Sequence, residues 1–328
     1  KMMPNLGKTN VRINQEDVLD HYRMELLENG LLNVNLSTDR LKILARLLGA
    51  INTDGNLSEC ELNGKVYYRA SFNLGEKIDA YRLWEDISSL GFSITGRIVQ
   101  TETAFNDEVN DRKCTYRTWT VNKDGAFAYL LYLLGGISGR KTTQVRSIPD
   151  WLMLAEPTVK REFLSGFQGG DGCRISYQHN QTSVNKCHLG RTGQTTIDLY
   201  VNDTVRYMEQ VSTLFTDLGI KTSVGCRKVN QTDNKTIVYI QFEQTTENLV
   251  KYADTIYYAY CEDKRRHSAA CIEHLRLRCF QQQQRENRYQ YISEHMDSIS
   301  IPELVTHTGI SERQVYKIIH KCKLGALP

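Results

Sequence analysis

The chain has 328 residues, of which 40% are hydrophobic and 24% are charged, a composition typical of a globular protein that is long enough for about two domains. It contains no run of about eighteen apolar residues, which excludes a membrane-spanning helix, and no apolar N-terminal stretch of the kind that a signal peptide needs. The formal net charge is only +3, so a nucleic-acid partner would require basic residues that are unevenly distributed over the surface.

The cysteines and the first residue bear on the compartment and the origin of the chain. Nine cysteines are present, none of them in a CxxC pair, and their odd number argues against a disulfide framework or a zinc cluster. We therefore expect a reducing, intracellular compartment. The chain begins at Lys1 rather than at a methionine, from which we expect a trimmed or excised fragment.

An amphipathic pattern over residues 15–30 predicts a helix that precedes the first of two similar halves. The first half opens with an apolar helical pattern that ends at Asp54 and Gly55, and runs of β-branched and aromatic residues then predict strands. The predicted elements are a helix at 41–53, a strand at 65–75, a helix at 76–92, strands at 93–101 and 114–122, and a helix at 125–137.

The second half follows a linker at 139–157 and repeats the order of the first. Residues 86–98 and 213–225 match in register at the end of a helix and the start of a strand, which predicts a duplicated domain. The predicted elements are a helix at 160–170 ending at Asp171-Gly172, strand character at 173–178, a polar loop at 179–194, a strand at 196–202, a helix at 203–220, strands at 221–229 and 236–244, and a helical run at 247–277.

The C-terminal piece has a different pattern. Residues 301–321 predict a short helix, a glycine-containing turn and a second helix that begins near Ser311. The pattern is typical of a helix-turn-helix that contacts DNA, although short helical hairpins in protein cores share it. The expected domains are an N-terminal extension (1–37), a first repeat (38–138), a linker (139–157), a second repeat (158–280) and a C-terminal extension (281–328).

Small residues recur on one face of the first helix of each half, Gly49 with Thr53 and Gly166 with Gly170, which permits two helices to pack backbone against backbone. Each helix is followed by an acid, so the packed pair would bring Asp54 and Asp171 together. Two carboxylates held that close repel each other unless a cation lies between them. Mg²⁺ or Mn²⁺ there would suit phosphodiester hydrolysis. The alternative is that each acid merely ends a helix before a glycine turn.

The nonamers LLGAINTDG (47–55) and LSGFQGGDG (164–172) resemble the LAGLIDADG motif of homing endonucleases, and IPDWL (148–152) resembles the usual lead-in of that family. The resemblance covers about residues 38–280. Asn52 and Gly169 depart from the first acid of the motif and Gln168 departs from an aliphatic, whereas both second acids are present.

The resemblance implies an α+β fold of two αββαββα repeats, related by a pseudo-two-fold axis, whose sheets form a DNA-binding saddle. It implies a monomeric enzyme that cuts both strands of a long double-stranded DNA site, leaves 3′ overhangs and depends on Mg²⁺ or Mn²⁺. Asp54 and Asp171 would bind the metal beside Thr53 and Gly170. Balanced net charge fits such a saddle, because acids cluster in the predicted helices 15–30 and 76–92, away from the concave face.

The resemblance also implies residues that organise the water and the scissile phosphate. Lys123 matches the basic position at the end of the fourth strand, with Gln244 opposite it in the second repeat. Asn73 matches the polar position on the second strand, with Tyr200 opposite it. The alternative for Lys123 is an exposed lysine at a strand end.

Alternate side chains of the strands would face the DNA, and basic helix residues would contact phosphates. The alternative is a solvated loop at 179–194 and a solvated helix face after Lys264. The residues expected on the DNA are Arg69, Ser71, Arg97, Gln100, Arg117, Arg174, Ser176, Gln178, Lys186, Arg191, Lys221, Ser223, Arg227, Lys228 and Gln241, with phosphate contacts from Lys264, Arg265, Arg266, Arg276 and Arg278.

Three other functions stay open at this stage. A transcription regulator can couple a degenerate fold of this family to a C-terminal helix-turn-helix, but such regulators have lost the acids that Asp54 and Asp171 retain. An intron-encoded maturase would bind RNA, and a purely structural protein would not need the paired acids. An intein origin lacks a splicing cysteine at the start and a His-Asn pair at the end, although a start at Lys1 suits an excised endonuclease.

Overall fold

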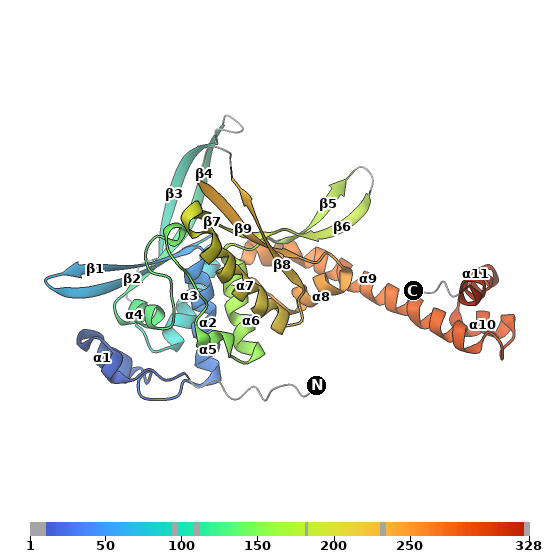
Figure 1. The fold of residues 1–328 in the computed structure, drawn as a ribbon, viewed down its shortest axis with the longest axis horizontal. Coiled ribbons are helices and arrows are strands. Elements are labelled where there is room, and N and C mark those ends of the chain that lie inside the picture. Colours follow the sequence, from blue (N-terminus) through green and yellow to red (C-terminus); the bar gives the residue numbers. More distant parts are fainter. Residues whose placement is uncertain (1–10, 94–97, 108–111, 181–182, 230–233, 325–328) are drawn as a thin grey trace. The chain divides into compact units, whose positions relative to one another are not determined.

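The computed structural model describes residues 11–93, 98–107, 112–180, 183–229 and 234–324. The chain divides into two compact units, one up to residue 271 and one from residue 272 onward, which we call the larger unit and the C-terminal unit (Figure 1). In the described part of the chain, no helix has both the length and the apolar character required to span a membrane.

The first repeat forms a helix, two strands, a helix, two strands and a helix, the order that the family resemblance implies. Its four strands form one antiparallel sheet in the order β1-β2-β4-β3. The elements are α2 (Thr38–Asn52), β1 (Gly55–Leu62), β2 (Lys65–Leu74), α3 (Lys77–Ser89), β3 (Ile98–Asp107), β4 (Arg112–Asp124) and α4 (Ala126–Leu133). The strand β1 is the one element of this repeat that the sequence analysis did not predict.

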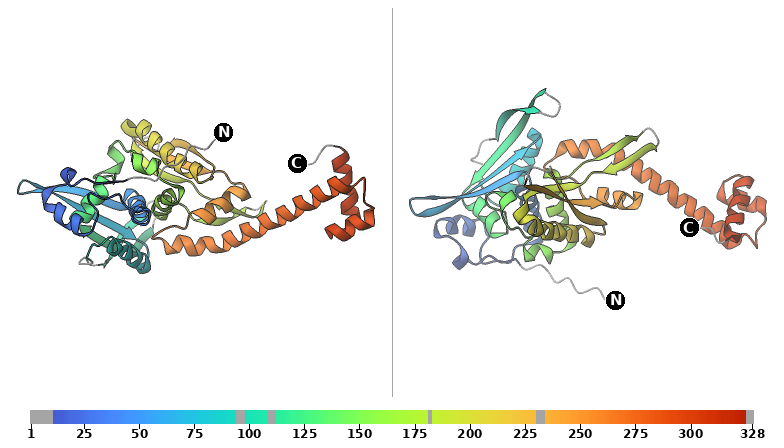
Figure 2. Two further views of the ribbon diagram at one scale, coloured as in Figure 1. Left: turned by 90° about the horizontal axis from the view of Figure 1, so that it is seen from below. Right: turned by 45° about the horizontal axis from the view of Figure 1, so that its top comes forward.

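The second repeat has the same plan with one addition. Its three-stranded sheet has the order β7-β9-β8, which matches β2-β4-β3 of the first repeat. In chain order, a separate hairpin of β5 and β6 replaces the equivalent of β1. Figure 2 shows this hairpin beside the three-stranded sheet. The elements are α6 (Pro157–Gly170), β5 (Ile175–Asn180), β6 (Ser183–Leu189), β7 (Thr192–Ile197), α7 (Val201–Asp217), β8 (Thr222–Lys228), β9 (Lys235–Phe242) and α8 (Thr246–Thr255).

Shorter elements complete the larger unit. The predicted N-terminal helix packs on the first repeat, where the Tyr22 hydroxyl accepts a hydrogen bond from the backbone of Tyr68 at 3.1 Å and the ring of Tyr22 lies 5.1 Å from that of Tyr129. These elements are η1 (Gln15–Asp17) and α1 (Asp20–Glu28) before the first repeat, η2 (Lys141–Thr143) and α5 (Asp150–Met153) between the repeats, and η3 (Asp198–Tyr200) before α7.

Two glycines allow the two repeats to pack closely against each other. Helices α2 and α6 lie side by side in the middle of the larger unit, with the sheet of each repeat on its own side (Figure 1). A Cβ on Gly49 would lie 2.2 Å from the carbonyl oxygen of Phe163, and a Cβ on Gly166 would lie 2.2 Å from that of Arg46. Real Cβ atoms do not approach a backbone oxygen so closely, so these two positions allow the helices to touch through their backbones.

Replacing Gly166 by alanine is therefore expected to destabilise the protein by about 1–3 kcal/mol or more, because the new methyl group forces the helices apart. Gly75→Ala is the matched control, because a Cβ there meets nothing within 4 Å. Chemical denaturation measures both variants. Equal stability of the two variants would mean that the helices do not meet at Gly166.

Three local predictions were wrong. The polar loop expected at 179–194 is mostly strand in its described part, because β5 pairs with β6, β7 pairs with β9 from Thr192 onward, and Cys187 and Leu189 are buried. The strand expected at 196–202 ends at Ile197. The helical run expected at 247–277 breaks after Thr255, where Tyr258 and Tyr260 have positive φ angles and the amide of Ala259 donates to the carbonyl of Ser165.

The C-terminal unit contains the later part of α9 (Glu262–His295) with α10 (Ile301–Thr308) and α11 (Glu312–Lys323). Its core is formed by Ile292, Leu304, Val315 and Ile318. Gly309 ends α10 in the left-handed conformation, with φ 64°, and Ser311 caps α11 through a capping box with Gln314. The second helix thus begins where the sequence predicts it.

Candidate active site

The carboxylates of Asp54 and Asp171 follow the C-terminal ends of α2 and α6. The two helices stay in contact to these ends, since a Cβ on Gly170 would lie 2.1 Å from the hydroxyl oxygen of Thr53. Burial raises the pKa of both acids. The pKa of Asp171 rises to about 6, mainly through burial and further through the negative charge of Asp54, so the two acids belong to one electrostatic site.

A small cavity of about 40 Å³ opens beside Asp54. Its walls include four residues that the sequence predicted for the site, Thr53, Asp54, Asn73 and Gly170, which come from the turn after α2, from β2 and from the end of α6; Asp171 is not among the residues that line it. The cavity is therefore where the two repeats meet, as the paired motifs imply. The side chain of Asn73 accepts a hydrogen bond there from the hydroxyl of Thr120 at 3.0 Å.

Two lysines cap the two helices, Lys141 in the segment after the first repeat and Lys264 in α9. The amine of Lys141 donates to the carbonyl oxygens of Ile51 at 2.8 Å, Thr53 at 2.6 Å and Gly55 at 2.5 Å. The amine of Lys264 donates in the same way to the carbonyls at the end of α6: Gln168, Gly169 and Gly170. Each cation thus meets the negative end of a helix dipole, and each lowers the pKa of both Asp54 and Asp171.

Burial lowers the pKa of Lys141 to about 8, although the charges of Asp171 and Asp54 act in the opposite direction. Lys141 was not expected at the site from the sequence, and Lys264 was expected only to contact a phosphate. A signal was present, because each lysine follows the last helix of its repeat, α4 or α8.

One oxygen of Asp171 is held by a buried chain of hydrogen bonds. The amide of Gln194 on β7 donates to Oδ2 of Asp171 at 2.7 Å, and the guanidinium of Arg146 donates to the other end of that amide. Arg146 also donates to Thr204 at 3.3 Å and lies 5.0 Å from the centre of the Tyr207 ring. In the described part of the chain no side chain donates a hydrogen bond to Asp54, so the two acids are held differently.

The donor set fits a hard divalent cation. Among the described residues no group of three or more His, Cys, Asp or Glu side chains could hold a metal ion. Mg²⁺ is commonly bound by one or two carboxylates and keeps waters or substrate phosphates as its other ligands, which matches the Asp54 and Asp171 pair. The backbone carbonyls of Thr53 and Gly170 already accept hydrogen bonds from Lys141 and Lys264.

The structure places the other expected catalytic residues elsewhere. The amine of Lys123 is buried and donates to the carbonyl of Ser93 at 3.0 Å. The side-chain amide of Gln244 bonds the backbone of Leu189 and Phe242, which ties β9 to β6. Tyr200 lies in η3, beyond the strand, so the polar residue that β7 directs at Asp171 is Gln194. The catalytic role that the family resemblance implies for Lys123 is tested below against Lys141 and Lys264, and that of Gln244 stays a prediction.

The residues expected on DNA lie largely on exposed strand faces. Arg69, Ser71 and Asn73 share the face of β2 opposite to the buried Ala70 and Phe72, as strand periodicity predicts. Arg191 is exposed and lies 4.3 Å from the centre of the Tyr239 ring. Those that are exposed and described are Arg69, Gln100, Arg117, Arg174, Arg191, Lys221, Ser223, Arg227, Lys228 and Gln241.

Several of these cations carry intramolecular partners, such as Arg117 with Glu102 at 3.5 Å and Lys221 with Glu243 at 3.6 Å. Exposed ion pairs of this kind are weak and exchange readily for phosphates. Ser176 is half-buried. Arg97 lies outside the described residues, as do the side chains of Gln178 and Lys186. DNA contact by this whole set stays a prediction.

Sequence comparison finds no matching protein-family model. The chain is 27% identical over 243 residues to the replication factor C small subunit of Methanocaldococcus jannaschii, covering 74% of this chain and 12% of that protein. It is 26% identical over 259 residues to the tRNA-splicing ligase RtcB of Pyrococcus furiosus, covering 77% and 25%. It is 25% identical over 257 residues to the RNA polymerase subunit Rpo1N of Methanocaldococcus jannaschii, covering 76% and 18%. The chain thus spans at most a quarter of the length of these three curated relatives.

Comparison of structures returns homing endonucleases. The match to I-DmoI, solved with its nicked target DNA and manganese, has a TM-score of 0.40 at 15% identity and covers 66% of this chain and 96% of that one. The match to the LAGLIDADG meganuclease I-AabMI, solved with uncleaved DNA, has a TM-score of 0.37 at 14% identity and covers 87% and 99%. Both of these matches have TM-scores below 0.5.

Proposed function

We propose that the chain is a site-specific DNA endonuclease of the LAGLIDADG homing type. It hydrolyses phosphodiesters on both strands of a long double-stranded target, depends on Mg²⁺ or Mn²⁺, and leaves 3′ overhangs. The observation that carries the proposal is the site itself: Asp54 and Asp171 follow two equivalent helices that meet through Gly49 and Gly166. Both halves of the site lie in one chain, which favours a monomer.

The chemistry follows from the residues of the site. Asp54 and Asp171 would hold the divalent cation, which supplies charge for the attacking and leaving oxygens when it is bound. Lys141 and Lys264 keep two further positive charges beside the acids, where negative charge on a reacting phosphate builds up. Gln194 and Arg146 fix the orientation of the Asp171 carboxylate. In this proposal, the exposed faces of β2 and β9 lie against the grooves of the DNA.

The curated relatives support an inserted origin for the chain. They are named for three different functions, and the matched segment is a minor part of each. A segment shared by proteins with such different names is better explained as an element inserted into each of them than as the part that performs their function. We therefore propose an intein-type origin, with an intron-encoded or free-standing enzyme as the alternative.

A DNA-binding regulator that does not cut is the second candidate. The observation that favours it is the C-terminal unit, in which a tight turn at Gly309 joins α10 to the capped helix α11. The retained pair of acids argues for the nuclease, because a regulator does not need a second carboxylate whose negative charge raises the pKa of Asp171.

Sequencing of cut ends tests the proposal. A randomised duplex library is incubated with Mg²⁺ and wild-type protein, and in parallel with Asp54→Asn, Asp171→Asn and the control Asp39→Asn, which replaces an exposed acid at the start of α2. We expect recurrent double-strand cuts with 3′ overhangs that persist only in the wild type and the control. Binding without cutting by the wild type would favour the regulator, and binding of RNA alone would favour a maturase.

A further inference from the structure

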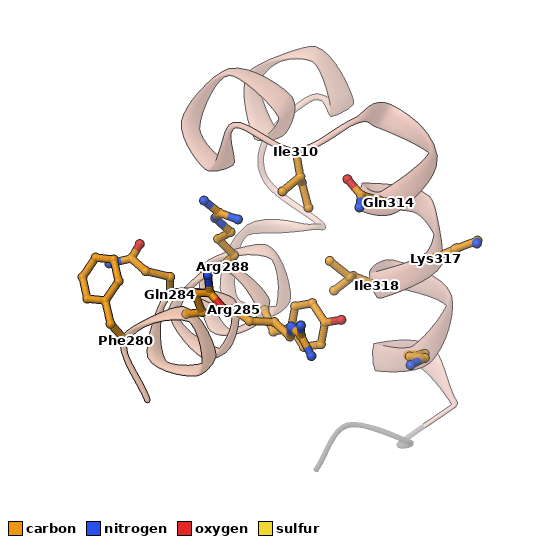
Figure 3. A pocket seen from close by; sticks show the side chains of 11 residues that line it. Phe280, Gln284, Arg285, Arg288, Ile310, Gln314, Lys317 and Ile318 are labelled. Atoms are coloured by element: carbon orange, nitrogen blue, oxygen red, sulfur yellow. The ribbon is translucent and has the colours of Figure 1, made fainter. Parts of the chain in front are cut away.

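A groove of about 640 Å³ lies in the C-terminal unit between the later part of α9 and the helix α11. Figure 3 shows Arg285 and Arg288 rising from α9, with Gln314 and Ile318 facing them from α11 and Lys317 on the outer rim. The residues that line it are Phe280, Gln281, Gln284, Arg285, Arg288, Tyr289, Ile310, Gln314, Lys317, Ile318 and Lys321. Ile318 belongs both to this lining and to the core cluster that holds the three helices together, and Tyr289 and Ile310 of the lining pack against that cluster.

The lining is positively charged. Four of the residues are cationic, three are glutamines, and none is acidic. The four cations are exposed, and within the described residues none of them has a hydrogen bond or an ion pair. Elsewhere in the part of the chain that the structure describes, most arginines are paired with an acid, for example Arg276 with Glu273 at 2.7 Å. Unpaired cations that line one groove from two helices are suited to an anionic partner.

The spacing of the cations suggests a polyanion rather than a single anion. Arg285 and Arg288 are three residues apart on α9, and Lys317 and Lys321 are four residues apart on α11, so each pair lies on one helix face. Charges that follow two helices in rows match the repeated phosphates of a nucleic-acid strand. The glutamine amides between them can donate hydrogen bonds to phosphate or sugar oxygens.

The exposed side of α11 indicates whether the groove would bind duplex DNA or duplex RNA. Arg313, Tyr316 and His320 lie on the same exposed face at helical spacing, and Tyr316 is 54% exposed. The major groove of B-form DNA admits a helix, whereas the major groove of an RNA duplex is too narrow for side-chain readout. The partner that fits both the helix and the charged groove is therefore duplex DNA.

We propose that the groove between α9 and α11 binds the phosphate backbone of duplex DNA while α11 enters the adjacent major groove. The choice of duplex DNA rests on the proposed nuclease function, and the proposal deepens it by assigning the C-terminal unit a second DNA contact, separate from the site at Asp54 and Asp171. The contact adds affinity, and it takes no part in phosphodiester hydrolysis.

Binding measurements without divalent ions test this contact. The full chain carries Asp171→Asn, so that no cutting interferes, and binds a fluorescent 60-base-pair DNA duplex of mixed sequence at several salt concentrations. Two groove variants, Arg285→Ala with Arg288→Ala and Lys317→Ala with Lys321→Ala, are compared with the control pair Arg206→Ala and Lys251→Ala on α7 and α8. All six side chains are exposed, so the fold is not at risk.

Each groove variant is expected to weaken binding at least about fivefold and to reduce the slope of log K against log salt by about 2, roughly one per lost phosphate contact. The control pair should change the affinity less than twofold. Unchanged affinity and slope in both groove variants would overturn the proposal, as would tighter binding of an RNA duplex of the same sequence. Because cutting is not measured, the result stands whether or not the wild type proves to be a nuclease.

Discussion

Asp171→Asn is expected to reduce double-strand cleavage at least about 100-fold and, in metal-free buffer at neutral pH, to make the protein more stable. The cleavage loss follows from removing a proposed ligand of the cation. The gain in stability follows from the raised pKa of Asp171, about 6 against an ordinary value of 3.8, because the folded protein tolerates the ionised carboxylate less well than the unfolded chain does. Asparagine keeps an acceptor for Gln194 without the charge.

The sign of the pH dependence separates this account from misfolding. Without metal, the wild type should lose stability as the pH rises from about 4 to about 6, by at most about 3 kcal/mol, and keep that lower stability above pH 6. Asp171→Asn should lack this decline. Denaturation curves at pH 4 to 8 and single-turnover cleavage measure the two effects. A variant that loses cleavage and stability together would indicate a structural role for Asp171 instead.

Replacing Lys264 or Lys141 by methionine is expected to lower the cleavage rate by about 100- to 1000-fold, because each amine places a positive charge beside the paired acids. Each change also removes the donor for carbonyls at a helix end, which should cost about 1.5–3 kcal/mol of stability. Cleavage is therefore compared at a temperature where every variant is folded by circular dichroism.

Lys123→Met is the informative comparison for these variants. Its amine bonds the carbonyl of Ser93, and the charges that act on Asp54 and Asp171 come from Lys141 and Lys264. We expect Lys123→Met to change the cleavage rate less than about threefold. If Lys123→Met abolished cleavage while both other variants kept it, the basic role would belong to the residue that family resemblance indicates.

The parts of the structure that the sequence predicts are those that local pattern determines. The glycines at 49 and 166, the acids that follow both helices and the first-repeat order are all visible as periodicity and repetition. The strand β6 was missed because polar residues make up most of its sequence. The break after Thr255 was missed because Ala259 bonds Ser165 on a distant helix, and no local propensity reports that contact.

Contacts between segments that are distant in sequence also explain which residues of the site the sequence did not predict. The hydrogen bond from Gln194 to Asp171 crosses from β7 to the end of α6, and Arg146 reaches Gln194 from the segment between the repeats. Lys141 and Lys264 act on the ends of helices far from them in sequence. Motif spacing finds the residues that a family shares in one segment, but it does not find those that the packing of separate segments brings together.

A carboxyl NMR titration tests most directly whether the two repeats build one site. The Asp171 signal is followed in metal-free wild type and in Asp54→Asn. The account predicts a pKa of about 6 in the wild type and a lower pKa in the variant, because the negative charge of Asp54 raises it. The same Asp171 pKa in both proteins would contradict the account, since it would mean that the two acids do not share a site.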